Sequence, residues 1–214
     1  MRKGILCFGD SNTYGYDPAG GRYDEETRWP MVMQRILGEG YRVVEEGLGG
    51  RTFSQDDPTE GGFKSGISYL PPCLKSHNPL ELVIVMLGTN DIKQRFGLNA
   101  QTIAHNLNEV VRIVRSYGMS AEGTAPGILV VSPPHIGEWV TEAVFSGAFV
   151  PHAHAISLEL AGQLQRYSKL LKCHFVDAAA HVQSCPADGV HLTAQAQIHL
   201  GRVLAEVVRE LVPQ

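Results

Sequence analysis

Short apolar segments recur along the chain, separated by longer amphipathic stretches. Five of them are rich in Val, Ile and Leu: residues 5–8, 41–46, 82–87, 128–131 and 173–176. Segments this short and this apolar suit strands of a sheet that is buried on both faces. Strands that alternate with helices imply right-handed crossovers between parallel strands. The pattern therefore predicts an α/β fold, a three-layer α/β/α sandwich around a five-stranded parallel sheet.

Helices are predicted in the stretches between these strands. Pro30 suits the first turn of a helix that stops at Gly38. Asn99 can cap a longer helix, with apolar residues at spacings of three and four, that ends at Gly118. Two more helices are expected at about residues 153–171 and 193–211.

Length and composition restrict the class of protein. A chain of 214 residues suits one domain, expected over residues 1–214. It is 43% hydrophobic with a formal net charge of −4, so it has no basic excess for nucleic acid. No apolar run approaches the ~20 residues of a membrane helix, and the first strand leaves no room for a signal peptide. We expect a cytoplasmic protein with neither a nucleic-acid nor a membrane partner.

The four cysteines show no C-x-x-C pairing. In a reducing compartment they are best treated as free thiols that mostly serve packing. Neither a zinc finger nor a disulfide framework is indicated, and no metal and no cofactor is expected.

The first predicted strand ends in Gly9-Asp10-Ser11. This places a hydroxyl at the carboxyl end of a buried strand, where open α/β sheets bind ligands. We interpret Ser11 as a nucleophile. An alternative on this stretch alone is that Asp10, Ser11 and Asn12 only cap the next helix, because Asp, Ser and Asn are favoured capping residues.

A histidine with a nearby carboxylate follows the fifth predicted strand. Asp188 and His191 are three residues apart, so one tight turn can project both side chains. The carboxylate can then hold one ring nitrogen while the other faces Ser11. A surface turn with a satisfied histidine is at least as common, but a serine nucleophile needs such a base. We predict Ser11, Asp188 and His191 as the catalytic residues.

Acyl transfer also needs hydrogen-bond donors for a developing oxyanion. After the third strand, the side-chain amide of Asn90 can donate, and after the second, the backbone N–H of Gly50 can donate. The N–H of Ser11 would be the third donor. The alternative is that both segments only shape turns, which Gly and Asn commonly do.

At this point four blocks carry a family resemblance. They are Gly-Asp-Ser-Asn at 9–12, Gly50, Gly-Thr-Asn-Asp at 88–91 and Asp-Gly-Val-His at 188–191. In this order they resemble the blocks of the SGNH (GDSL) hydrolases. The resemblance implies a flavodoxin-like three-layer sandwich, and it matches the four namesake residues to Ser11, Gly50, Asn90 and His191.

Residues 45–52, 86–93 and 132–136 resemble the intracellular arylesterase and acyltransferase branch of that family. The resemblance implies a serine esterase for short acetyl or aryl esters, with acyl transfer to alcohols and a homo-oligomeric state as further expectations. A deacetylase for carbohydrate or other acetyl esters is the alternative on the same site. Substrate-pocket residues are expected from sequence proximity and from the branch: Asn12, Tyr16, Trp29, Lys93, Phe145 and Val190.

Two segments, 49–68 and 133–150, are long for loops of an α/β domain and are expected to shape the site. The second is rich in apolar residues, which predicts that it walls a pocket or meets another subunit, unless it folds back on its own domain. These residues are Ile136, Trp139, Val140, Val144, Phe145, Phe149 and Val150.

Two other functions are alternatives. In a flavodoxin-like binding protein, Ser11, Asn12 and Thr13 would form a phosphate loop at a helix start, but Asp188 and His191 would then have no role. A metal hydrolase is suggested by three histidines, but neither H-E-x-x-H nor clustered carboxylates accompany them. The three are His135, His152 and His154.

Overall fold

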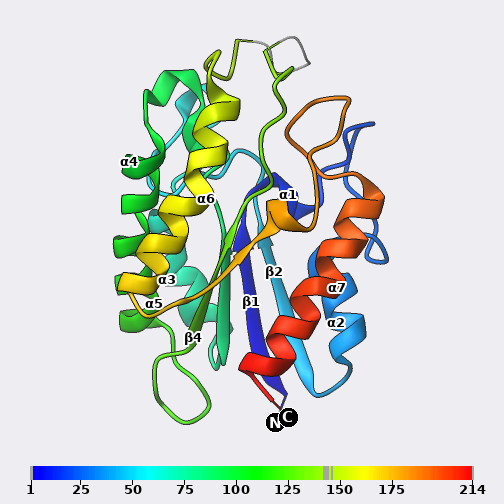
Figure 1. Ribbon diagram of the computed structural model, residues 1–214. Helices are drawn as coiled ribbons and strands as arrows, with labels where there is room; N and C mark the ends of the chain where they lie inside the picture. The colour runs from blue at the N-terminus through cyan, green and yellow to red at the C-terminus, as the bar shows by residue number, and fades with distance from the viewer. Residues whose placement is uncertain (1, 142–144, 146, 214) are drawn as a thin grey trace.

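The computed structural model describes residues 2–141, 145 and 147–213. Its central feature is a parallel sheet in the strand order β2-β1-β3-β4-β5 (Figure 1). The strands are β1 (Lys3–Gly9), β2 (Tyr41–Gly47), β3 (Leu82–Met86), β4 (Gly127–Ser132) and β5 (His174–Asp177). Each overlaps a predicted segment with shifts of one or two residues at its ends, and the predicted fold class is confirmed.

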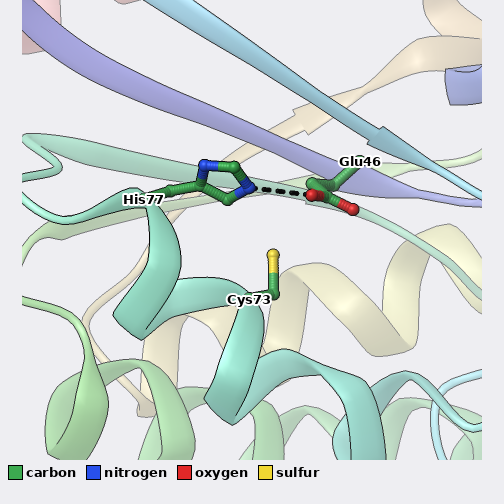
Figure 2. Close-up of side chains that lie close together, drawn as sticks. All are labelled: Glu46, Cys73 and His77. Atoms are coloured by element: carbon green, nitrogen blue, oxygen red, sulfur yellow. Dashed lines mark hydrogen bonds and ion pairs between the residues drawn. The ribbon is translucent and has the colours of Figure 1, made fainter.

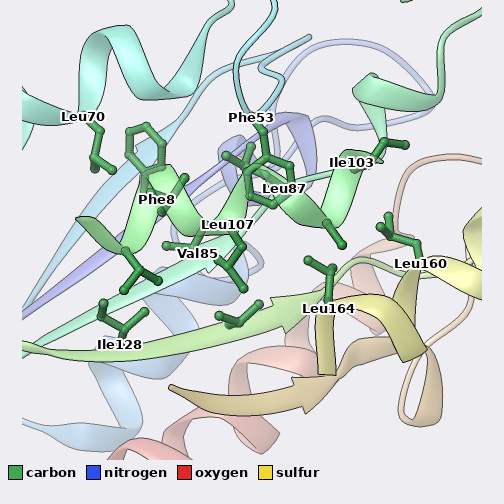
Figure 3. Close-up of a cluster of buried hydrophobic side chains, with 14 of the residues drawn as sticks. Phe8, Phe53, Leu70, Val85, Leu87, Ile103, Leu107, Ile128, Leu160 and Leu164 are labelled. Atoms are coloured by element: carbon green, nitrogen blue, oxygen red, sulfur yellow. The ribbon is translucent and has the colours of Figure 1, made fainter. Parts of the chain in front are cut away.

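Apolar residues cover both faces of the sheet, as alternate residues of β1 illustrate. Ile5 and Cys7 belong to one hydrophobic core, and Leu6 and Phe8 to the other. Helices α2 (Trp29–Leu37) and α7 (Ala194–Leu211) cover the first face. The second face is covered by α3 (Gly66–His77), α4 (Ala100–His105), α5 (Leu107–Tyr117) and α6 (Ala153–Leu170) (Figure 1). Figure 3 shows this second core around Phe8 and Val85.

The helix predictions are confirmed with two differences. The predicted 99–118 helix is divided at Asn106 into α4 and α5, although Asn99 caps it as expected, its side chain accepting from Thr102 N at 2.9 Å. Helix α3 was not predicted, because Pro71 and Pro72 lie inside it and proline ordinarily interrupts a helix. Its buried residues pack into the second core all the same.

Short helical turns follow several strand ends. They are α1 (Ser11–Tyr14) and the 3₁₀ turns η1 (Pro58–Glu60), η2 (Asn90–Ile92), η3 (Gln94–Phe96) and η4 (Ala178–Ala180). Among the described residues, none of the helices combines the length and the apolar character needed to cross a bilayer.

The strand order reverses direction at β1, since β2 lies on one side of it and β3 on the other. Such switch points open a crevice at the carboxyl ends of the strands. Ser11 follows β1, Gly50 follows β2 and Asn90 follows β3. The fold therefore brings three of the predicted site residues to one edge of the sheet.

Candidate active site

Ser11 lies in the first turn of α1, directly after β1. Asp10 is the N-cap, and its carboxylate accepts a hydrogen bond from Asn12 N at 2.9 Å. The strand must end in a small residue here, because a Cβ on Gly9 would meet the side chain of Thr13 and come within 2.8 Å of Met86 O. The Gly-Asp-Ser sequence thus makes both a helix cap and an exit from the strand that aims Ser11 at the crevice. Capping and a chemical role for Ser11 are compatible.

Ser11, His191 and Asp188 form a continuous hydrogen-bonded chain. His191 Nε2 lies 2.9 Å from Ser11 Oγ, and His191 Nδ1 lies 2.8 Å from Asp188 Oδ2. All three residues are buried, with 4% to 7% of their surface exposed. The spacing of Asp188 and His191 in one turn therefore does what the sequence predicts: it aims one ring nitrogen at the serine and the other at the carboxylate.

The environment of Asp188 favours its charged form. Burial raises the pKa of this carboxyl, but the hydrogen bonds from the His191 ring and from the backbone N–H groups of Val190 and His191 together hold it below its ordinary value. A carboxylate that stays ionised can stabilise a positive charge on His191.

Asn12 holds this turn in place from the side of α1. Its Oδ1 accepts from Leu192 N at 3.0 Å, and its Nδ2 donates to Val190 O at 3.3 Å. It therefore binds the backbone on both sides of His191. Asn12 is 1% exposed, so the structure gives this predicted pocket residue a positioning contact rather than a place in the cavity wall.

Three potential donors face the same region. The amide of Asn90 donates one hydrogen bond to Arg51 O at 3.1 Å, which leaves its second N–H for another acceptor. Among the described residues, the backbone N–H groups of Ser11 and Gly50 have no hydrogen-bond acceptor. Gly50 has φ of +79°, and a Cβ there would lie 2.4 Å from Glu60 Oε2. The positive φ explains the glycine, because the end of the Glu60 side chain could move aside at little cost.

A cavity of about 360 Å³ opens over these groups. It is lined by Ser11, Gly50, Asn90 and His191 together with four of the predicted pocket residues, Tyr16, Lys93, Phe145 and Val190. The ring of Tyr16 lies 4.3 Å from the His191 ring, and Phe145 meets it edge-on at 5.5 Å. The imidazole is thereby held between two aromatic side chains.

Charged residues that were not predicted from the sequence line a further part of the cavity wall. Glu60 and Lys64 line the cavity beside Lys93. Glu60 Oε1 pairs with Lys93 Nζ at 2.5 Å and with Arg95 at 2.6 Å, and Arg95 also pairs with Asp57 at 2.7 Å. The long 49–68 loop signalled a functional segment, but nothing in the sequence pairs Glu60 with Lys93.

Trp29 is a correction to the predicted pocket. Its side chain is completely buried in the core that α2 and α7 form on the first face of the sheet. Proximity in sequence to α1 suggested a place in the pocket. The hydrophobic face of α2 instead turns Trp29 toward α7, where its backbone N–H donates to Gln197 Oε1 at 3.0 Å.

The 133–150 loop mostly folds back on its own domain. Ile136, Val140 and Phe149 are buried, and Phe149 lines the cavity, whereas Trp139 is 41% exposed. Val144, which also belongs to the predicted apolar surface, lies outside the described residues. The loop thus satisfies most of its apolar side chains within one chain.

The histidines that suggested a metal hydrolase have other contacts. His154 Nδ1 lies 2.6 Å from Ile136 O, and its Nε2 lies 3.5 Å from Glu138. His152 is the N-cap residue of α6. Within the part of the chain that the structure describes, none of the three histidines belongs to a group of three or more potential ligands that lie close together.

Comparison with known proteins agrees with this geometry. Residues 7–202 match the model of the GDSL-like lipase/acylhydrolase family. Est24, a carbohydrate acetylesterase from Sinorhizobium meliloti, is 38% identical over 98% of this chain and 100% of its own, with a TM-score of 0.89. The M. smegmatis aryl esterase is 38% identical over 98% of this chain and 100% of its own, with a TM-score of 0.87. No curated protein sequence matches the chain.

The fold, the strand-end site and the match over most of the chain define the class: an α/β hydrolytic enzyme of the SGNH type. The chain belongs to the GDSL-like lipase/acylhydrolase family. It is accordingly a carboxylic ester hydrolase.

Proposed function

We propose that the protein is a serine esterase that hydrolyses short acetyl or aryl esters through an acyl-enzyme on Ser11. The observation that carries the proposal is the chain of hydrogen bonds from Ser11 through His191 to Asp188, in which Ser11 and His191 line a 360 Å³ cavity. A nucleophile in contact with a base, and a base oriented by a third group, are the elements that activate serine.

In the first half of the reaction, Ser11 Oγ forms a bond to the ester carbonyl carbon while His191 Nε2 takes the hydroxyl proton. Asp188 stabilises the resulting imidazolium. Breakdown of the tetrahedral intermediate breaks the bond to the alcohol, which takes the proton from His191 as it leaves. Water then repeats the sequence on the acyl-enzyme, releases the acid and restores Ser11.

The oxyanion would be held by the N–H groups of Ser11 and Gly50 and by the Asn90 amide. This assignment is supported by the unpaired backbone donors, by the shared cavity and by the hydrogen bond from Asn90 to Arg51 O, which fixes the amide before substrate binds. Donors fixed in advance need no reorganisation as the charge develops.

The cavity favours small substrates. Its volume of about 360 Å³ lies at the lower end of ordinary ligand sites. Phe145, Phe149 and Val190 supply apolar walls for an acyl or aryl group. A long acyl chain would have to cross the charged wall at Glu60 and Lys64 or remain in water.

The test is a panel of p-nitrophenyl esters from acetyl to dodecanoyl, assayed on the wild type and on Ser11→Ala. We expect the highest kcat/KM at two to four carbons and a loss of at least about 10⁴-fold in the variant. Ser132→Ala is the matched control, since Ser132 is a buried serine at the end of β4. A preference for eight carbons or more contradicts the substrate class, and an active Ser11→Ala variant contradicts the mechanism.

A sugar acetate is the second candidate substrate. The carboxylate of Glu60 and the ammonium groups of Lys64 and Lys93 line the cavity and can bind sugar hydroxyls, and Est24 carries the name of carbohydrate acetylesterase. Acetate release from an acetylated monosaccharide, measured beside p-nitrophenyl acetate, separates the two. Added alcohol in the same assay measures acyl transfer as the yield of the new ester.

Assembly and location belong to the same proposal. We propose a cytoplasmic location and a homo-oligomeric state, and exposed apolar side chains support the second of these, among them Phe63 at 87% and Trp139 at 41% exposure. Phe149 is buried in its own domain, so it is unsuited to test an interface. Light scattering checks the assembly: a mass near the 23.3 kDa of one chain refutes an oligomer.

A further inference from the structure

Three potential metal ligands converge where the edge strand β2 meets α3. Glu46 lies on β2, and Cys73 and His77 lie on α3 (Figure 2). A carboxylate oxygen, the thiol sulfur and an imidazole nitrogen all lie within 4.8 Å of one another. None of the three residues lines the 360 Å³ cavity of Ser11.

The sequence builds this cluster from two simple patterns. Cys73 and His77 are four residues apart, so they project from the same face of the helix. Glu46 meets that face from the strand, and its Oε1 already lies 2.8 Å from His77 Nε2. Cys73 is 1% exposed, while the side chains of Glu46 and His77 are 18% and 29% exposed. The cluster therefore has a buried sulfur and an outer side that solvent can reach.

The spacing is close to that of a tetrahedral metal site. Zinc binds sulfur at about 2.3 Å and nitrogen or oxygen at about 2.0–2.2 Å, which places neighbouring ligand atoms roughly 3.4–3.6 Å apart. To reach this spacing, the distance between Glu46 Oε1 and His77 Nε2 would increase by less than about 1 Å. The distances from these two atoms to Cys73 Sγ would decrease by little more than about 1 Å. Small changes in the side-chain torsion angles of the partly exposed Glu46 and His77 are sufficient to bring the three ligand atoms to these distances.

We propose that Glu46, Cys73 and His77 bind one Zn²⁺ ion, which fastens the edge strand β2 to α3. A thiolate, an imidazole and a carboxylate are the ligands zinc prefers, whereas Mg²⁺ and Ca²⁺ select oxygen ligands alone. Zinc with one thiolate, one carboxylate and neutral His77 is a neutral group. The half-buried location therefore does not have to hold a net charge.

Two cations lie near this site: Arg42, whose guanidinium donates to His77 O at 2.6 Å, and Arg51. Arg51 is the one that faces Glu46 and Cys73. Its guanidinium donates to the backbone carbonyls of Gly9 and Glu46 and lies over the Phe8 ring, 4.3 Å from the centroid. Burial raises the pKa of the Cys73 thiol to about 12 and the carboxylate of Glu46 adds to this, while Arg51 opposes it. Without metal the sulfur is a thiol. Zinc binding forms the S–Zn bond and releases the thiol proton to solvent.

A path to the site exists on the side of Glu46. A second cavity, of about 580 Å³, is lined by Glu46 together with Arg51, Phe63 and Tyr69. The hydroxyl of Tyr69 lies 3.5 Å from Glu46 Oε1, so the wall of this cavity touches the ligand set. Water in the cavity can fill the fourth coordination position.

The test is titration of the chelator-treated full chain with ZnCl₂ by isothermal calorimetry, with CoCl₂ as a spectroscopic probe of sulfur ligation. We expect one site per chain, a thiolate-to-cobalt charge-transfer band and a rise in the melting temperature with zinc, because a ligand that binds only the folded state stabilises it. Cys73→Ser, His77→Asn and Glu46→Gln should each weaken zinc binding by at least about tenfold, since even changes outside the ligand shell cost that much.

The double variant Cys173→Ser/His174→Asn is the matched control, because this Cys-His pair lies at the opposite edge of the sheet. Its zinc affinity should equal that of the wild type. Circular dichroism of the metal-free variants tests whether they are folded, and Glu46→Gln keeps the shape of the side chain it replaces. The proposal is overturned if the wild type binds zinc no more tightly than Cys73→Ser, or if the cobalt band is absent.

Discussion

The two sides of the Ser11 cavity are held by different forces. On the His191 side, backbone hydrogen bonds fix the site: Asp188 accepts from two N–H groups, and Asn12 binds the backbone on both sides of the imidazole. On the Glu60 side, ion pairs of Glu60 with Lys93 and Arg95 hold the cavity wall.

This difference between hydrogen bonds and ion pairs predicts different roles for the two sides, the reaction itself on one and the choice of substrate on the other. Short-range hydrogen bonds between neighbouring turns fix the position of reacting atoms. Ion pairs between long side chains fix atomic positions less firmly than such hydrogen bonds do, and salt screens them when they are exposed. We therefore expect changes on the His191 side to abolish turnover and changes on the Glu60 side to alter which ester is preferred.

Asn90 also lines the cavity, and its loss gives the largest effect expected outside the Ser11, His191 and Asp188 chain. Asn90→Ala removes a donor to the proposed oxyanion, which typically lowers kcat by about 10²–10³-fold. The measurement is the steady-state kinetics of p-nitrophenyl acetate, with circular dichroism to establish folding. A folded variant that loses less than threefold in kcat would exclude Asn90 from the oxyanion site.

Asp91 anchors the Glu60 side and makes stability depend on pH. Both carboxyl oxygens accept from Phe53 N at 3.1 Å. Burial, the largest cause, raises the pKa of Asp91 from 3.8 to about 7, and that of Asp10 to about 6. The folded state then holds protons that the unfolded chain has released, so stability falls as the pH rises from about 4 to 7.

In Asp91→Asn, the free energy of unfolding should fall less steeply as the pH rises. The contribution of Asp91 that is lost amounts to up to about 1.4 kcal/mol per pH unit. The measurement is urea denaturation at pH 5, 6, 7 and 8. A variant as pH-dependent as the wild type across this range would contradict a protonated Asp91 in the folded protein.

Glu60 gives the smallest expected effect and tests the selectivity assigned to its wall. Glu60→Gln removes the carboxylate that pairs with Lys93 and Arg95. The Glu60 side chain is 36% exposed, so these ion pairs are partly screened by solvent. We expect KM for p-nitrophenyl acetate to change by about fivefold at most, with kcat nearly constant. Glu109→Gln is the control, because it breaks a surface ion pair with Arg112. Equal KM values in both variants would remove Glu60 from substrate selection.

The parts of the site that sequence could predict are those encoded locally. The Gly9-Asp10-Ser11 strand exit and the Asp188-to-His191 turn each contain their geometry within a few residues, and the strand order brings them together. Glu60 was missed because its partners Lys93 and Arg95 lie more than thirty residues away, and no periodicity relates them.

Two other differences have the same physical origin in packing. Trp29 was assigned to the pocket by proximity in sequence, but the apolar face of α2 turns it into the core against α7. Helix α3 was missed because Pro71 and Pro72 argue against a helix locally, whereas burial of Leu70 and Leu74 in the second core favours one. In both cases contacts with distant elements outweigh the local signal.

In the proposed mechanism, Ser11 is the residue that becomes acylated. The most direct measurement is mass spectrometry of the protein after treatment with a small alkyl fluorophosphonate, which reacts with activated serines, followed by peptide mapping. We predict one added group per chain, on the peptide that contains Ser11, and no labelling of Ser11→Ala. Labelling of another residue, or equal labelling of Ser11→Ala, would contradict it.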